Sequence, residues 1–284
     1  MKKVKIIECP RDAMQGIRSH FIPTEAKSQY INSLLRVGFD TIDFGSFVSP
    51  KAIPQMRDTA DVLAKLDLSK TKSKLLAIVA NIRGANDASH FEEIDYLGYP
   101  FSISENFQMR NTHKTIAQSI IILEEVLTIA DKTNKEVVAY LSMGFGNPYG
   151  DSWNVEIVSN WTEQLSNMGV TTLSLSDTIG SSTPTIITEL FSNLIPAYTH
   201  IEFGAHLHTT PTSWFEKVDA AYKAGCKRFD GAIKGFGGCP MATDELTGNM
   251  PTEKLLSYFN QQKATTNLQA MSFESAYNEA LKIF

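Results

Sequence analysis

Eight short segments rich in β-branched and aromatic residues recur along this chain, and segments with the apolar spacing of amphipathic helices separate them. The predicted strands cover residues 4–8, 41–47, 75–79, 99–103, 136–141, 171–176, 200–206 and 228–233. Helices are expected over residues 24–35, 114–130, 214–224 and 252–259. Eight alternating strand–helix units are compatible with two architectures, a closed barrel or an open, doubly wound sheet.

The residues after the first predicted strand help to decide between these architectures. They are Pro10, Arg11 and Asp12, whereas a dinucleotide-binding sheet has a glycine-rich phosphate loop there. The chain has 284 residues, and a (β/α)8 barrel typically has roughly 250. We therefore predict an α/β fold, with one (β/α)8 TIM-barrel domain over residues 1–284 that includes C-terminal helices. The active site of such a barrel lies at the C-terminal ends of its strands.

Charge and apolar pattern exclude several classes of partner. A net charge of −5 with dispersed basic residues predicts no nucleic-acid partner. No apolar run reaches the ~20 residues of a membrane span, and the polar N-terminal segment does not have the pattern of a signal peptide. Cys9, Cys226 and Cys239 are odd in number and far apart, which favours reduced thiols in the cytoplasm. The sequence leaves a homodimer open as the assembly.

His206 and His208 are two residues apart at the end of the seventh predicted strand, so both imidazoles should project into the barrel mouth. Such a pair is a common metal-binding arrangement, and two buried core histidines are the alternative. Asp12 and Asn249 are candidate further ligands, although Gly248 and Asn249 are also typical of a turn before a helix. Nitrogen and oxygen donors without a thiolate favour Mg²⁺ or Mn²⁺, with Zn²⁺ as an alternative.

Arg11 and Cys239 are two further candidates at the same rim. Because Arg11 precedes Asp12, its guanidinium can face an oxygen that becomes anionic during a reaction. A salt bridge from Arg11 to Asp43 or Glu8 is an equal alternative. Cys239 follows a glycine-rich loop that can carry a thiol over the mouth. A thiol can exchange protons near neutral pH, and a small buried free cysteine is the alternative.

Four segments resemble the 3-hydroxy-3-methylglutaryl-CoA lyase family, which belongs to a superfamily of metal-dependent lyases and Claisen-type synthases on TIM barrels. The segments are residues 7–15 (IECPRDAMQ), 46–56 (SFVSPKAIPQM), 173–180 (LSLSDTIG) and 235–240 (GFGGCP). Their order and spacing match the family across nearly the whole chain. The resemblance implies an enzyme that uses a divalent cation to cleave an acyl-CoA substrate into acetyl-CoA and acetoacetate.

The resemblance also implies roles for single residues. The implied metal ligands are Asp12, His206, His208 and Asn249. The implied catalytic residues are Arg11, Cys239, Asp43, Asp177 and His206, and the implied substrate-binding residues are Arg11 and Gln15. In this scheme, Arg11 stabilises the enolate of the departing acetyl-CoA and Cys239 protonates it.

Four departures from the family pattern concern specificity. Asp43 stands where the family has a longer glutamate, and Thr209 stands where the family has an aspartate. Ala13 and Gly16 also replace a usual glycine and asparagine, and the loop from Cys239 to Asn249 is one residue longer. Together these departures concern the choice of acyl group more than the class of reaction. Two other functions stay open: a Claisen-type synthase that joins acetyl-CoA to a 2-oxo acid, and a metal-bearing barrel that binds acyl-CoA without turnover.

Overall fold

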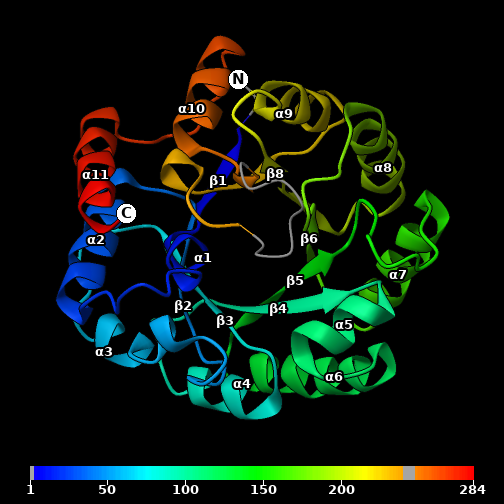
Figure 1. Ribbon diagram of the computed structural model, residues 1–284, viewed down its shortest axis with the longest axis horizontal. Coiled ribbons are helices and arrows are strands. Elements are labelled where there is room, and N and C mark those ends of the chain that lie inside the picture. The colour runs from blue at the N-terminus through cyan, green and yellow to red at the C-terminus, as the bar shows by residue number, and fades with distance from the viewer. Residues whose placement is uncertain (1–2, 239–246) are drawn as a thin grey trace.

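The computed structural model describes residues 3–238 and 247–284, and a closed barrel of eight parallel strands lies at its centre (Figure 1). The strands are β1 (Lys5–Glu8), β2 (Thr41–Ser46), β3 (Lys74–Ile78), β4 (Tyr96–Ser102), β5 (Glu136–Ser142), β6 (Thr172–Ser176), β7 (Glu202–His206) and β9 (Arg228–Gly231). Each strand pairs with the next one along the chain, and β9 closes the barrel against β1. The predicted (β/α)8 architecture is confirmed.

Helices form a ring around the strands (Figure 1). They are α1 (Pro10–Gln15), α2 (Thr24–Val37), α3 (Thr59–Leu63), α4 (Ile82–Ser89), α5 (Glu105–Thr112), α6 (Ile116–Lys132), α7 (Val155–Asn167), α8 (Pro184–Ala197), α9 (Trp214–Lys223), α10 (Thr252–Gln261) and α11 (Ala270–Ile283), with short 3₁₀ turns η1 (Pro54–Met56) and η2 (Ile233–Gly235). Within the described ranges, none of these helices has the length and apolar character needed to cross a membrane.

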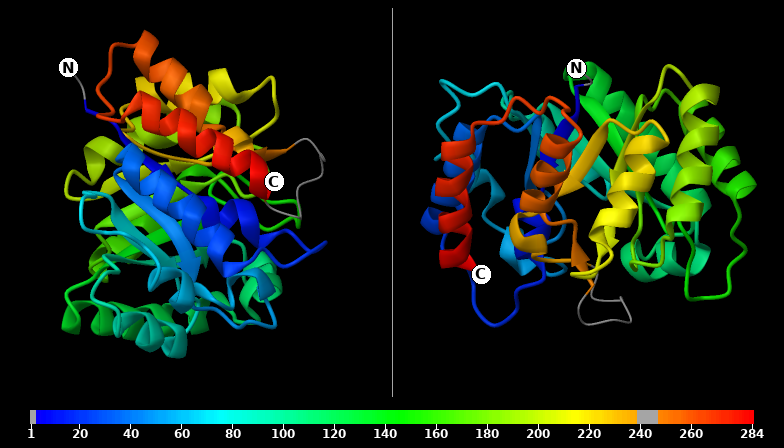
Figure 2. Two further views of the ribbon diagram at one scale, coloured as in Figure 1. Left: turned by 90° about the vertical axis from the view of Figure 1, so that its left-hand side faces the viewer. Right: turned by 90° about the horizontal axis from the view of Figure 1, so that it is seen from above.

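Two connections tie distant parts of the chain together near the barrel. Two-residue strands β8 (His208–Thr209) and β10 (Gly248–Asn249) pair in antiparallel fashion. Helix α11 packs along α2 on one side of the barrel (Figure 2), where the rings of Tyr30 and Phe284 meet edge to face with centroids 6.2 Å apart. The C-terminal helix therefore covers the first long helix.

Most predicted boundaries agree with the structure within a few residues, and β4 is the main exception. This strand begins at Tyr96, three residues before the predicted start at residue 99. Residues 96–98 do not have a strand pattern in the sequence, because Gly98 is among them and glycine is a poor strand former. A Cβ atom at Gly98 would lie 2.6 Å from Ile78 Cδ1 and 2.8 Å from Leu76 Cδ2. The packed side chains of β3 therefore require glycine there, while pairing with both neighbouring strands keeps the backbone extended.

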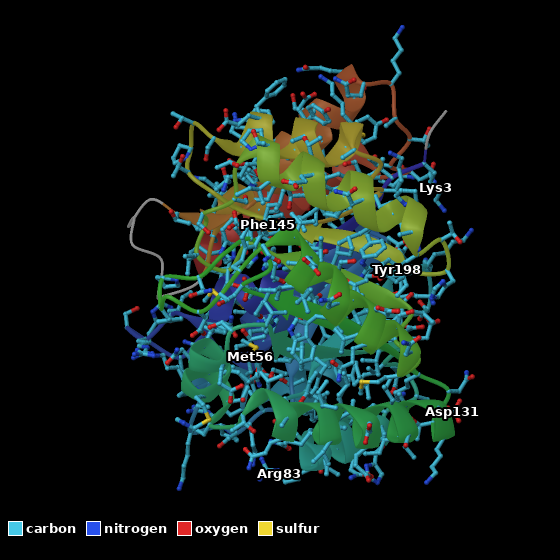
Figure 3. All side chains as sticks on the ribbon, turned by 90° about the vertical axis from the view of Figure 1, so that its right-hand side faces the viewer. Lys3, Met56, Arg83, Asp131, Phe145 and Tyr198 are labelled. Atoms are coloured by element: carbon cyan, nitrogen blue, oxygen red, sulfur yellow. The ribbon has the colours of Figure 1, made fainter. Side chains whose placement is uncertain are left out.

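The hydrophobic core lies mainly between the strands and the surrounding helices. Arg83 and Asp131 lie at the periphery of the view in Figure 3, whereas Phe145 lies nearer its middle and is buried. A smaller apolar cluster comprises Leu76, Ile78, Tyr96, Val138 and Tyr140, from β3, β4 and β5. The β9 strand contributes buried polar groups instead of extending this cluster.

Glu8 is a fully buried carboxyl group where β1 meets the segment after β9. Its Oε1 accepts a hydrogen bond from the backbone N–H of Ile233 (2.9 Å), and its Oε2 accepts one from the hydroxyl of Thr252 (2.6 Å). Burial raises the pKa of Glu8 to about 8, although these hydrogen bonds act in the opposite direction. Glu8 is therefore protonated in the folded protein at neutral pH, whereas it is ionised in the unfolded chain.

Replacing Glu8 should change how the free energy of unfolding depends on pH. Between an unfolded pKa near 4.5 and a folded pKa of about 8, the native protein binds the extra proton, so its stability falls as pH rises. Glu8→Gln should remove this contribution, which has a slope of at most about 1.4 kcal/mol per pH unit. Urea unfolding of both proteins from pH 5 to 8 measures the difference. Parallel pH profiles would contradict the assignment, and Glu125→Gln, at an exposed position of α6, is the matched control.

Candidate active site

The first strand delivers Arg11 and Asp12 to the barrel mouth through a short helix. Pro10 occupies the first turn of α1, a position that its fixed φ angle and missing N–H suit. Helix α1 begins two residues after β1 ends, so Arg11 and Asp12 stay at the C-terminal end of that strand. Both side chains are largely buried. The site is therefore built on a helical turn fixed by the barrel wall.

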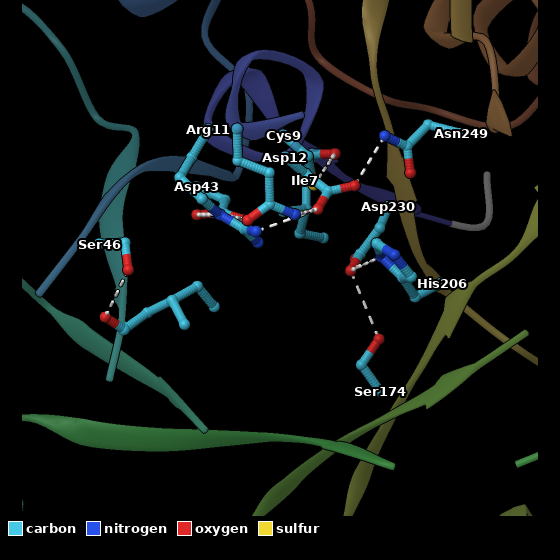
Figure 4. Close-up of polar contacts among 12 residues, drawn as sticks. Ile7, Cys9, Arg11, Asp12, Asp43, Ser46, Ser174, His206, Asp230 and Asn249 are labelled. Atoms are coloured by element: carbon cyan, nitrogen blue, oxygen red, sulfur yellow. Dashed lines mark hydrogen bonds and ion pairs between the residues drawn. The ribbon is translucent and has the colours of Figure 1, made fainter. Parts of the chain in front are cut away.

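The two histidines come together with Asp12, as the strand pattern predicts (Figure 4 shows Asp12 and His206). His206 ends β7 and His208 begins β8, and their rings lie 5.3 Å apart between centroids. One potential ligand atom from each of Asp12, His206 and His208 lies within 4.8 Å of the other two. This is a compact group of one carboxylate and two imidazoles.

Asn249 reaches the same group from β10. Its backbone lies opposite His208 in the β8–β10 pair, and its Nδ2 donates to Asp12 Oδ2 (2.7 Å) and to the carbonyl oxygen of Phe236 (2.9 Å). A Cβ atom at Gly237 would lie 2.7 Å from Asp12 O and 3.0 Å from Asn249 Nδ2. A glycine is therefore needed for the close approach of this loop to the site.

The hydrogen bonds of the two histidines involve Nδ1 of each ring, which leaves Nε2 of each ring for a cation. His208 Nδ1 lies 3.0 Å from the carbonyl oxygen of Thr178, and His206 Nδ1 lies 3.1 Å from Asp230 Oδ2. Among the described residues, the buried Nε2 of His208 has no hydrogen-bond partner. A neutral imidazole of this kind, beside a carboxylate and an amide, fits a divalent cation with mixed nitrogen and oxygen ligands.

The protonation states of His208 and Asp12 also suit metal binding. Burial and the neighbouring His206 lower the pKa of His208, which favours the neutral ring. Burial alone would raise the pKa of Asp12, but Arg11 and the two histidines lower it below its ordinary value. Asp12 and His208, as candidate ligands, are therefore in the forms that bind cations. His206 differs, because burial alone would lower its pKa but the hydrogen bond to Asp230 raises it.

Arg11 is held between two carboxylates in this site (Figure 4). Its Nε lies 3.1 Å from both carboxylate oxygens of Asp43, its Nη2 also donates to Asp43, and its Nη1 donates to Asp12 Oδ1 at 3.0 Å. The salt bridge to Asp43 is therefore present, whereas the alternative pairing with Glu8 is wrong, because Glu8 bonds to Ile233 and Thr252. Burial raises the pKa of Asp43 to about 6 against the lowering effect of Arg11, so Asp43 is ionised at neutral pH.

Gln15 and Asp177 lie in different positions relative to the histidines. Gln15 Nε2 donates to Asp12 Oδ1 at 2.5 Å from the next turn of α1. Asp177 is buried and forms an ion pair with Lys217, whose ammonium also donates to the carbonyl oxygen of His208, with both distances 2.8 Å. Gln15 therefore contacts the candidate ligand directly, whereas Asp177 acts on the backbone of His208 through Lys217.

Sequence reasoning missed Asp230 and Lys217. Asp230 follows Arg228 by two residues on the last predicted strand, and a charged pair within a barrel strand is a detectable signal. Lys217 lies on α9 and carries no local signal, because its partner Asp177 is 40 residues away in the sequence. Both residues are recognised through contacts between different elements.

A cavity of about 470 Å³ opens beside α1, next to the loop after η2. Its lining residues are Ala13, Gly16, Ile17, Ser19, His20, Phe236, Gly237, Gly238, Thr247, Ile283 and Phe284. The predicted proton donor Cys239 follows Gly238 in the chain and lies outside the described residues.

The chain is similar in sequence and structure to a group of lyases. It is 35% identical to hydroxymethylglutaryl-CoA lyase YngG of Bacillus subtilis over 97% of this chain and 91% of the relative. A crystal structure of the Bacillus subtilis HMG-CoA lyase matches with a TM-score of 0.92 and 34% identity, covering 100% of this chain and 94% of that one. An HMG-CoA lyase from Acinetobacter baumannii, in complex with coenzyme A and 3-methylmalate, matches with a TM-score of 0.89 and 28% identity, covering 99% and 91%.

A protein-family model extends this similarity over nearly the full length. The model described as HMGL-like matches residues 3–279, which include all eight strands of the barrel and the candidate ligands. The family resemblance found in the four sequence segments is therefore confirmed. This chain belongs to the HMGL-like family.

Proposed function

We propose that this protein is a divalent-metal-dependent carbon–carbon lyase that cleaves 3-hydroxy-3-methylglutaryl-CoA, or a close 3-hydroxy-acyl-CoA, to acetyl-CoA and acetoacetate or its counterpart. The observation that carries the proposal is the group of Asp12, His206 and His208, with ligand atoms within 4.8 Å of one another and Arg11 hydrogen-bonded to Asp12. Relatives that align over most of the chain are named hydroxymethylglutaryl-CoA lyases, which supports this substrate.

The proposed metal ligands are Asp12, His206, His208 and Asn249, with Mg²⁺ or Mn²⁺ as the preferred ion and Zn²⁺ as an alternative. The bound cation supplies Lewis acidity toward the substrate oxygens. The chain itself fixes the ligands: Asp230 accepts a hydrogen bond from His206 Nδ1, and the Thr178 carbonyl oxygen accepts one from His208 Nδ1. These contacts turn the Nε2 atoms of both rings toward the site.

Arg11 is the proposed electrostatic catalyst. Its guanidinium is anchored by Asp43 and Asp12, so it does not need to reorganise when negative charge develops on the thioester oxygen. Asp43 holds this orientation, and the pKa of Arg11 is raised, so the guanidinium stays charged; burial opposes this rise and Asp43 is its main cause. Gln15 is proposed to bind substrate while it also orients Asp12.

Cys239 is the proposed acid that protonates the enolate, an assignment that rests on the family resemblance and on its place in the glycine-rich loop. The cavity beside α1 is the proposed place for part of the acyl-CoA, because Gly237 and Gly238 bring its wall to the edge of the metal group. Asp177 is proposed to act as a positioning residue through Lys217 and the His208 backbone. The buried thiols of Cys9 and Cys226 are unpaired, which supports a cytoplasmic location.

A turnover assay tests this function. Purified protein with 3-hydroxy-3-methylglutaryl-CoA and Mg²⁺ should release acetyl-CoA and acetoacetate in equal amounts, and chelation should stop the reaction until Mg²⁺ or Mn²⁺ is restored. The same protein with acetyl-CoA and a 2-oxo acid should release no coenzyme A. Release of coenzyme A there, without cleavage of any 3-hydroxy-acyl-CoA, would indicate a synthase. Binding of the acyl-CoA without products would contradict the lyase.

Arg11→Met should lower kcat by roughly 10²–10³, the usual cost of losing a preorganised oxyanion donor. Binding of a non-reacting CoA ester should change far less, because the charge that Arg11 stabilises forms only during the reaction. Thermal unfolding must accompany the kinetics, since the variant leaves Asp43 buried without its partner. Arg36→Met, at an exposed position of α2, is the matched control. A lost affinity with kcat intact would assign Arg11 to substrate anchoring alone.

A further inference from the structure

A group of polar side chains occupies the barrel interior next to His206. Arg228 and Asp230 are two residues apart on β9 and so share a face of the strand. Asp230 Oδ2 lies 3.4 Å from Ser174 Oγ on β6, and the guanidinium of Arg228 lies 6.0 Å from the ring centroid of Tyr96 on β4. Neither β6 nor β4 neighbours β9 in the barrel, so these contacts cross its interior.

Tyr140 joins this group from β5. Its ring stands edge to face with His206 at 5.7 Å between centroids, and a Cβ atom at Gly98 would lie 3.3 Å from its Cε2. On the other side, a Cβ atom at Gly204 would lie 3.2 Å from Arg228 Cδ. The ring of Tyr140 is therefore closely packed against Gly98, and the aliphatic part of Arg228 against Gly204. The polar ends of these two side chains have little freedom to move to other partners.

Four buried polar atoms of these residues have no hydrogen-bond partner within the described protein. They are Nε and Nη2 of Arg228, the hydroxyl oxygen of Tyr140 and Oδ1 of Asp230. Unpaired buried groups of this kind are destabilising, and ordered water molecules commonly satisfy them in protein interiors. The group contains donors, an acceptor and a hydroxyl that does both, which is the chemistry that holds water.

Charge supports the same arrangement. Arg228 Nη1 lies 3.4 Å from Glu202 Oε2 and 4.0 Å from Asp40 Oδ1, which leaves its other nitrogens for the interior. Burial alone would lower the pKa of Arg228, but Asp230, Tyr140 and Glu202 raise it overall, so the guanidinium is charged. A buried cation near Asp230 compensates the charge of a carboxylate that would otherwise be costly to bury.

We propose that bound water molecules inside the barrel join Arg228 and Tyr140 to Asp230 Oδ1, and that Arg228 and Tyr140 are thereby positioning residues for His206. Asp230 Oδ2 accepts the hydrogen bond from His206 Nδ1 at 3.1 Å. The water molecules fix the other oxygen of the same carboxylate, so the imidazole keeps the orientation that directs Nε2 toward Asp12. This inference rests on the proposed metal centre and extends it by one layer of residues.

Tyr140→Phe is the most direct test, because it removes only the hydroxyl. If water holds that hydroxyl, the variant should unfold at a lower temperature than the parent. It should also bind Mn²⁺ about tenfold more weakly, the lower end of the usual cost of losing a partner beyond the metal ligands. Free Mn²⁺ measured by electron paramagnetic resonance gives this affinity without an activity assay. If the interior is dry, removing an unpaired hydroxyl should raise the unfolding temperature and leave Mn²⁺ affinity unchanged, which would overturn the proposal.

Tyr99→Phe is the matched control. Tyr99 is also buried on a barrel strand, but its hydroxyl donates to the carbonyl oxygen of Ser119 at 3.0 Å, on the helix side of β4. Its loss should lower the unfolding temperature without changing the dissociation constant for Mn²⁺. An equal weakening of Mn²⁺ binding in Tyr99→Phe and Tyr140→Phe would mean a general loss of stability, and it would overturn the positioning role.

Two further variants separate this inference from the metal centre itself. His208→Ala should abolish most Mn²⁺ binding, and a parent that binds no better than this variant would contradict the metal centre. Arg228→Lys keeps the positive charge but loses the Nε and Nη2 donors, so it should weaken Mn²⁺ binding in the same direction as Tyr140→Phe. If the parent binds Mn²⁺ tightly and both Arg228→Lys and Tyr140→Phe bind it equally tightly, the metal centre stands and the positioning role is wrong.

Discussion

The carboxylate of Asp12 is the point on which the candidate site depends. Three side chains donate to it: Arg11 and Gln15 from the same short helix, and Asn249 from β10. His206 and His208 complete the group from the other side of the mouth. Asp12 thus joins the beginning of the chain to Asn249, 237 positions later, and to the two histidines. The proposed metal binding, the orientation of Arg11 and the position of β10 all depend on this one group.

The pairing of β1 with β9, which closes the barrel, positions Asp12. Strand β1 pairs with β9, and Glu8 bonds to Ile233 and Thr252 just beyond β9, so α1 starts from a fixed place. On β9 itself, Asp230 orients His206 through the hydrogen bond to its Nδ1. Fold stability and ligand geometry are therefore linked at β9, whose buried polar residues replace the apolar side chains expected in a barrel interior.

Local patterns predict the barrel and much of its rim because strand ends are visible in the sequence and the strand period places His206 and His208 on one face. The same rule places Asp12 across the mouth. Contacts between distant elements are not visible in this way. Lys217 contacts the His208 carbonyl oxygen from α9, and Asp230 on β9 contacts Ser174 on β6, with β7 between these two strands. The early start of β4 was missed because the need for Gly98 comes from its packing against β3.

In the proposed metal centre, Asp12, His206 and His208 hold a divalent cation at the barrel mouth. Anomalous diffraction from crystals of the protein prepared with Mn²⁺ tests it most directly, because the signal locates the ion without reference to activity. We expect one strong peak in contact with Asp12 and with Nε2 of both histidines, and Asn249 turned so that its amide oxygen faces the ion. A fully bound ion elsewhere, or no peak at this group at saturating Mn²⁺, would contradict this metal centre.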